Sequence, residues 1–102
     1  HKIAFVPMPK FPSVKRDLAL LLDKQVSFKE VKELALRTEK SLLKSVTLFD
    51  VYEGEKLGNG KKSYAVSFTL LDEEKTLTDK QIDKIMNKLI GAYKHQFNAE
   101  IR

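Results

Sequence analysis

The clearest pattern in the chain is a two-residue alternation across residues 61–72. Apolar side chains stand at every second position, with small or polar ones between them: Tyr64, Val66, Phe68 and Leu70 against Ser63, Ala65, Ser67 and Thr69. This period predicts a half-buried strand. Residues 45–54 are also rich in strand-forming side chains, and the residues that follow can supply the turn: Gly54, Gly58, Asn59 and Gly60. We therefore predict a β-hairpin with one apolar face and one small, polar face.

Two helices are predicted from capping signals followed by apolar side chains at helical spacing. Ser27 and Glu30 form a capping box before residues 27–40, and Thr78 and Gln81 form another before residues 78–94. The apolar stripes are Val31, Leu34, Ala35 and Thr38 in the first helix, and Ile82, Ile85, Met86, Leu89 and Tyr93 in the second. Lys80, Lys84 and Lys88 run down the other side of the second helix, which we expect to be solvated.

Two further strands complete the predicted fold. Leu18, Leu20 and Leu22 share one face of residues 16–23, and residues 99–102 can form a short last strand. With right-handed crossovers, this order gives an α+β, ferredoxin-like βαββαβ sandwich. We expect a four-stranded antiparallel sheet with both helices on one face and the first and third strands in its centre. Residues 1–15 hold all three prolines, and we expect them to form an arm packed on the domain of residues 16–102.

Composition limits the function. The 102 residues, 42% of them hydrophobic, suit one domain with a modest core. A net charge of +5 favours an anionic partner, with nucleic acid first among the candidates. No apolar run approaches the roughly 18 residues of a membrane span, so we expect none. The chain contains no cysteine, which fits a reducing compartment without demanding one. It does not begin with Met, and we expect a longer parent protein.

No catalytic residue or metal site is predicted. His95 has no carboxylate or serine partner nearby in sequence, and two histidines without cysteine give no metal-ligand pattern. Two other families share this topology: an acylphosphatase would need an arginine in the loop after the first strand, and a regulatory module of the ACT type would show glycine there. This chain has Lys24-Gln25-Val26. The outward positions of the central strands also lack the aromatics on which an RNA-recognition motif stacks bases.

Several segments together resemble one known family. They are residues 11–19, 48–54, 60–63, 75–79 and 97–102, which read FPSVKRDLA, LFDVYEG, GKKS, KTLTD and FNAEIR. In register and in order, they resemble the ferredoxin-fold anticodon-binding domain, which closes the β subunit of bacterial phenylalanyl-tRNA synthetase and the single-chain organellar enzyme. Two positions depart from the family pattern: Lys75 replaces another basic residue, and Asn98 stands where glycine is usual.

The resemblance implies which side chains would contact RNA. It points to Asp50, Tyr52 and Ser63 as anticodon contacts, with Arg102 as a weaker fourth. Tyr52 would supply a ring for an unpaired base, and Asp50 and Ser63 would hydrogen-bond base edges. Lys61 and Lys62, beside Ser63, would meet phosphates. The plainer interpretation is that Tyr52 covers the base of the hairpin and Asp50 caps its loop.

The resemblance also implies a parent enzyme, phenylalanine–tRNA ligase, a class II aminoacyl-tRNA synthetase of the cytoplasm. Its ATP and Mg²⁺ would bind elsewhere, so no cofactor and no catalysis are expected in these residues. The implied partners are the anticodon stem-loop of tRNA(Phe), the rest of the β subunit and the catalytic α subunit of an α2β2 enzyme. The alternative is a ferredoxin-like regulatory module that binds a small ligand or a protein partner at the sheet edge.

Overall fold

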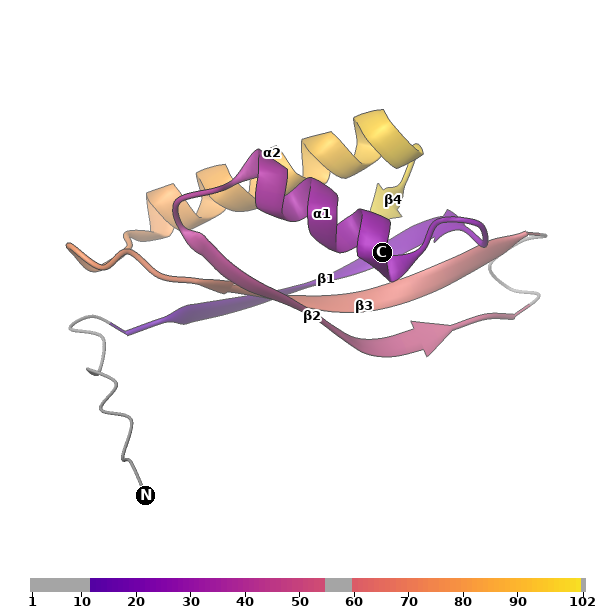
Figure 1. The fold of residues 1–102 in the computed structure, drawn as a ribbon, viewed down its shortest axis with the longest axis horizontal. Helices are drawn as coiled ribbons and strands as arrows, with labels where there is room; N and C mark the ends of the chain where they lie inside the picture. Colours follow the sequence, from indigo (N-terminus) through magenta and orange to yellow (C-terminus); the bar gives the residue numbers. More distant parts are fainter. Residues whose placement is uncertain (1–11, 55–59, 102) are drawn as a thin grey trace, which may run out of the picture.

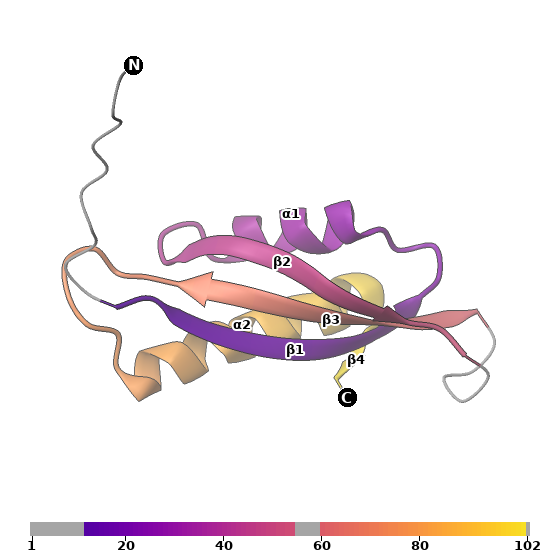
Figure 2. The ribbon, with the colours of Figure 1, turned by 90° about the horizontal axis from the view of Figure 1, so that it is seen from below.

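The computed structural model describes residues 12–54 and 60–101. Their helices and strands follow the predicted order and are β1 (Val14–Asp23), α1 (Phe28–Thr38), β2 (Leu43–Tyr52), β3 (Lys61–Leu70), α2 (Asp79–Phe97) and β4 (Glu100–Ile101). The strands form one four-stranded sheet in the order β2-β3-β1-β4 (Figure 2). All three pairings are antiparallel. Both helices cover the same face of the sheet (Figure 1), so the predicted ferredoxin-like fold is confirmed.

Both helices begin with the predicted capping boxes. The N–H of Glu30 donates to Ser27 Oγ over 3.3 Å, and the N–H of Ser27 donates to Glu30 Oε2 over 2.8 Å. Thr78 and Gln81 make the same reciprocal pair at α2. These bonds satisfy N–H groups that have no partner within the helix.

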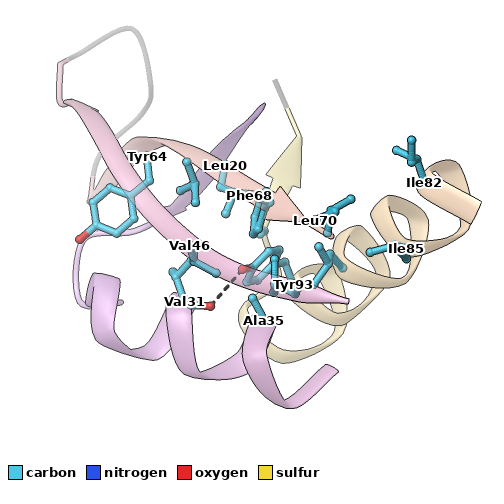
Figure 3. Packing of buried hydrophobic residues seen from close by; sticks show 14 of the residues in the cluster. Leu20, Val31, Ala35, Val46, Tyr64, Phe68, Leu70, Ile82, Ile85 and Tyr93 are labelled. Carbon is cyan, nitrogen blue, oxygen red and sulfur yellow. Dashed lines mark hydrogen bonds between the residues drawn. The ribbon is translucent and has the colours of Figure 1, made fainter. Parts of the chain in front are cut away.

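The core lies between the helices and the face of the sheet that they cover (Figure 3). Fully buried side chains come from all the layers and include Leu20, Leu22, Val31, Val66, Phe68, Leu70, Leu89 and Tyr93. The hydroxyl of Tyr93, on α2, donates to the carbonyl oxygen of Val31, on α1, over 3.0 Å. Burial raises the pKa of this phenol above its ordinary value. The bond joins the two helices inside the core, where a polar group needs a partner.

Several boundaries differ from the prediction. Strand β1 begins at Val14, so it includes the last two residues of the predicted arm. Residues 1–11 lie outside the described residues, and packing of the arm stays a prediction. Leu18 shares a face with the buried Leu20 and Leu22, where we expect a core position, but it is only half-buried. Helix α2 continues to Phe97, and Asn98 ends it with φ 53° and ψ 35°, the left-handed conformation that asparagine tolerates. Neither described helix is long and apolar enough to cross a membrane.

Strand β2, at one edge of the sheet, is irregular. Its register against β3 shifts twice, once between Leu43 and Ser45 and once between Leu48 and Asp50. At the second shift Leu48 pairs with Val66 and Asp50 pairs with Ala65, so Phe49 is an extra residue. This arrangement is a β-bulge, which interrupts the alternation of side chains along the strand.

Candidate nucleic-acid interface

The sheet has one face without helices, which we call the open face. Because Tyr64, Val66, Phe68 and Leu70 are buried on the helix side, the residues between them point to the open face. The register places Asp50 opposite Ala65 and Tyr52 opposite Ser63. These four residues line a hollow of about 240 Å³, which we call the β2–β3 hollow. The structure thus brings together Asp50, Tyr52 and Ser63, the first three residues that the resemblance implied.

Tyr52 is the aromatic side chain of the hollow. It is 48% exposed, so its ring is accessible to a ligand. Gly54 lies beside the ring: a Cβ added there would be 3.4 Å from the Tyr52 hydroxyl oxygen and 3.6 Å from Cζ. Gly54 therefore lies close to the hydroxyl end of the ring, and the residue as a whole remains about half exposed. An exposed, supported ring is suited to stacking against a planar base.

Asp50 and Ser63 supply the polar groups of the hollow. Asp50 Oδ1 accepts a hydrogen bond from the N–H of Val51 over 2.9 Å, which orients the carboxylate. A carboxylate has further lone pairs, so Asp50 can also accept bonds from amino or imino groups of a base. Ser63 lies on the central strand β3 and is only 5% exposed, and its hydroxyl can donate or accept. A ring, an acceptor and a hydroxyl in one hollow are the groups that read an unpaired nucleotide.

Phe49 does not lie where the simple alternation puts it. If Phe49 and Val51 both faced the core, Asp50 and Tyr52 would face away from the helices. The orientation of Asp50 and Tyr52 agrees, but Phe49 is 56% exposed because it is the extra residue of the bulge. Val51 stands opposite the buried Tyr64 and is itself 45% exposed. Sequence reasoning therefore missed the exposure of Phe49, and also Ala65 as part of the hollow.

The two lysines predicted to meet phosphates lie on opposite faces of β3. Lys61 shares the open face with Ser63, and its Nζ lies 2.7 Å from Asp23 Oδ1. Its contact with phosphate stays a prediction. Lys62 stands opposite the fully buried Leu22 and is 8% exposed, and its Nζ donates to the hydroxyl of Tyr64 over 2.6 Å. Lys62 therefore points to the helix side, away from Ser63, because neighbouring residues of a strand point to opposite faces. Its contact with phosphate also stays a prediction. Arg102 lies outside the described residues.

An ion pair between a buried glutamate and an exposed lysine holds the start of β2 on the helix side. Lys88 Nζ, on α2, lies 3.0 Å from Oε1 of Glu39, which is 9% exposed in the turn after α1. Lys88 is exposed, as expected for this side of the helix, and it is also paired with Glu39. Burial pushes the pKa of Glu39 upward, but hydrogen bonds from Lys88 and from the N–H of Leu42, with attraction to the Lys88 charge, hold the pKa below its usual value of 4.5. The ionised carboxylate therefore joins α2 to the turn that leads into β2.

A larger hollow, of about 450 Å³, lies on the helix side. It is lined by residues of α1 and the end of α2 with charges of both signs, among them Glu30, Glu33, Arg37, Lys40 and Phe97. Of the described residues implied for RNA contact, none lines this hollow. Within residues 12–54 and 60–101, no three histidine, aspartate or glutamate side chains gather as a metal site would require. The β2–β3 hollow is therefore the candidate site.

Comparison with known proteins identifies the family. Residues 9–102 match the family described as the ferredoxin-fold anticodon binding domain. The chain belongs to this family. Nearly the whole chain is included, so the β2–β3 hollow is part of the family domain and not an appended segment.

Three similar relatives of this anticodon binding domain share one name. The chain is 58% identical over 101 residues to the phenylalanine–tRNA ligase beta subunit of Bacteroides fragilis, and 59% identical over 101 residues to that of Bacteroides thetaiotaomicron. It is 56% identical over 102 residues to the beta subunit of Porphyromonas gingivalis. These alignments cover 99–100% of this chain and 12% of each relative. The domain thus spans about an eighth of the length of these relatives.

Proposed function

We propose that this domain binds the anticodon stem-loop of tRNA(Phe) at the β2–β3 hollow. An unpaired base would stack on the open side of Tyr52. Asp50 would accept hydrogen bonds from its amino or imino groups, and the Ser63 hydroxyl would bond its edge or its ribose. The observation that supports this proposal most strongly is the register that places these three side chains around one exposed hollow.

The overall charge supports a nucleic-acid partner. A net charge of +5 draws the domain toward phosphates and gives the affinity a dependence on salt. Lys61 shares a face with the hollow and would contribute to this attraction, although its ion pair with Asp23 reduces the contribution. Phosphate contacts of this kind position RNA, whereas Tyr52, Asp50 and Ser63 would distinguish its bases.

We further propose that the parent protein is the β subunit of a cytoplasmic phenylalanine–tRNA ligase. The names of the relatives support this parent. A catalytic α subunit in an α2β2 assembly would carry out aminoacylation with ATP and Mg²⁺. In this arrangement the domain holds one end of the tRNA while chemistry occurs at the other. The proposed role is positioning, which matches the polar, shallow hollow better than catalysis does.

The test is a tyrosine substitution in the assembled full-length enzyme. Tyr52→Ala should weaken tRNA(Phe) binding about tenfold, because base–aromatic stacking contributes roughly 1–3 kcal/mol and ~1.4 kcal/mol is a factor of ten. Tyr52→Phe should keep most of the affinity, since the ring makes the contact. Filter binding measures both, and pyrophosphate exchange with phenylalanine and ATP should be unchanged.

The matched control is Thr47→Ala, an exposed residue of the same strand that stands opposite Ser67 and outside the hollow. It should bind tRNA normally. If Tyr52→Ala keeps its circular dichroism spectrum and binds tRNA with the affinity of the unmodified enzyme, Tyr52 only covers the hairpin. That result would favour the alternative of a regulatory module.

A further inference from the structure

Exposed apolar side chains gather in one short stretch of β2. Among the described residues, the large hydrophobic side chains that are strongly exposed are Phe49 (56%), Val51 (45%) and Tyr52 (48%). Earlier residues of the same strand behave differently: Val46 is 4% exposed and Leu48 packs against the core. An apolar group concentrated on an otherwise polar surface marks a place of interaction.

The bulge puts Phe49 and Asp50 on the same part of the sheet. Leu48 pairs with Val66 and Asp50 pairs with Ala65, so Phe49 and Asp50 together stand opposite Ala65. With regular pairing after Leu48, Phe49 alone would stand opposite Ala65, and Asp50 would stand opposite Tyr64 on the core side. A bulge breaks the ladder and redirects a side chain, and bulges are common beside functional sites. Here the irregularity places a phenylalanine next to two residues that line the β2–β3 hollow, Asp50 and Ala65.

Folding alone gives no reason for this position. Burial of an apolar ring stabilises a fold, and Phe49, which is 56% exposed, forgoes much of that gain. Phe68, on the neighbouring strand, is fully buried and shows that the core accepts such a ring. The ring of Phe49 carries no hydrogen-bonding group, so its useful chemistry is apolar contact or stacking.

We propose that Phe49 is a second base-stacking side chain and that the site holds two neighbouring unpaired nucleotides. This inference rests on the proposed function. A strand rises about 3.3 Å per residue, so Phe49 and Tyr52 lie roughly 10 Å apart along β2, and less where the bulge bends it. One nucleotide stacks on Tyr52, and the adjacent nucleotide stacks on Phe49 at the rim of the hollow. Single-stranded RNA is commonly bound by successive bases on successive rings.

The first experiment measures tRNA(Phe) binding to the assembled full-length enzyme with Phe49→Ala, Phe49→Leu and Phe49→Tyr. Phe49→Ala should bind about tenfold more weakly, and Phe49→Leu nearly as weakly, because leucine keeps apolar volume but has no π-face. Phe49→Tyr should bind normally. Val51→Ala is the matched control, since Val51 is similarly exposed but stands opposite Tyr64 of the core face, and it should bind within about twofold of the unmodified enzyme.

The second experiment identifies the nucleotides. A series of tRNAs, each with one abasic position in the anticodon loop, is titrated against Tyr52→Ala and Phe49→Ala. Each substitution should weaken binding of every tRNA except the one that lacks the base stacked on the substituted ring. For Tyr52→Ala and Phe49→Ala, these two abasic positions should be adjacent in the anticodon loop. Such coupling is the measure of a direct pairwise contact.

The outcomes separate the two proposals. If Tyr52→Ala weakens binding and Phe49→Ala does not, the second stacking contact is refuted while the proposed function stands. If neither does, both are refuted. If Phe49→Leu binds tRNA normally, or if Val51→Ala binds it much more weakly, the contact is a general apolar one and the stacking proposal is refuted. Unchanged tRNA affinity with weakened assembly of the enzyme would assign Phe49 to a protein interface, which also overturns the proposal.

Discussion

Strands β2 and β3 are equally long and pair with each other, but they are built differently. β3 lies between two neighbours and pairs with β1 over ten residues without a shift. Its side chains alternate between the buried core and the open face. β2 has a partner on one side only, its register shifts twice, and its last four residues are all exposed. The regular strand forms the core, and the irregular strand presents most of the candidate site.

This difference has a physical basis. A central strand that supports a core on one face has its register fixed, because a slip of one residue would bury every polar side chain. An edge strand is free of a second neighbour and can take up an extra residue. In this domain the extra residue turns Asp50 and Tyr52 to the open face, while Ser63, on the regular strand, gives the hollow a fixed floor.

The largest expected effect compares two phenylalanines. Phe68→Ala, on β3, should reduce the free energy of unfolding by about 3–5 kcal/mol, because it removes a fully buried ring and leaves a cavity. Phe49→Ala, on β2, should change it by less than about 1 kcal/mol, since the ring is 56% exposed. Urea unfolding of the 102-residue chain measures both. Equal losses would show that Phe49 is part of the core and that the two strands do not differ as described.

A smaller effect concerns the start of β2 and its dependence on pH. The pKa of Glu39 is held below 4.5 in the folded protein, so its ion pair with Lys88 stabilises the fold above that pH. The contribution should be lost as the pH falls through the folded-state pKa. Between pH 6 and pH 3.5, the urea midpoint should therefore fall further in the unmodified chain than in Glu39→Gln.

Glu33→Gln, an exposed position of α1, is the control for this titration and should follow the unmodified chain. If Glu39→Gln loses as much stability on acidification as the unmodified chain does, the ion pair does not stabilise the turn before β2. The result would leave β2 attached mainly through its pairing with β3.

The regular parts of the fold were predictable from the sequence. The alternation of Tyr64 to Leu70 gave β3, and the capping boxes at Ser27 and Thr78 gave both helix starts. These features are local: each depends on side chains a few residues apart, so the sequence displays them directly. The edge position of β2 followed from the order of elements and the handedness of crossovers.

The bulge at Phe49 was not predicted, although the sequence contains a sign of it. Val46 and Leu48 keep a period of two, and the next apolar residues are Phe49 and Val51, one position out of phase. That shift of phase indicates an extra residue in the strand. Lys62 lies on the face opposite Ser63 because residues that are neighbours in a strand point to opposite faces. The pair between Glu39 and Lys88 joins residues far apart in the chain, which no local pattern displays.

The central claim is that RNA binds the open face at β2 and not the helices. Ultraviolet cross-linking of tRNA(Phe) to the assembled full-length enzyme, followed by mass spectrometry of the peptides, tests it most directly. Within this domain, cross-links should fall on residues 49–52 and at Ser63, and those at residue 52 should disappear in Tyr52→Ala. Cross-links confined to α1 and α2, with none on β2 or β3, would contradict the account.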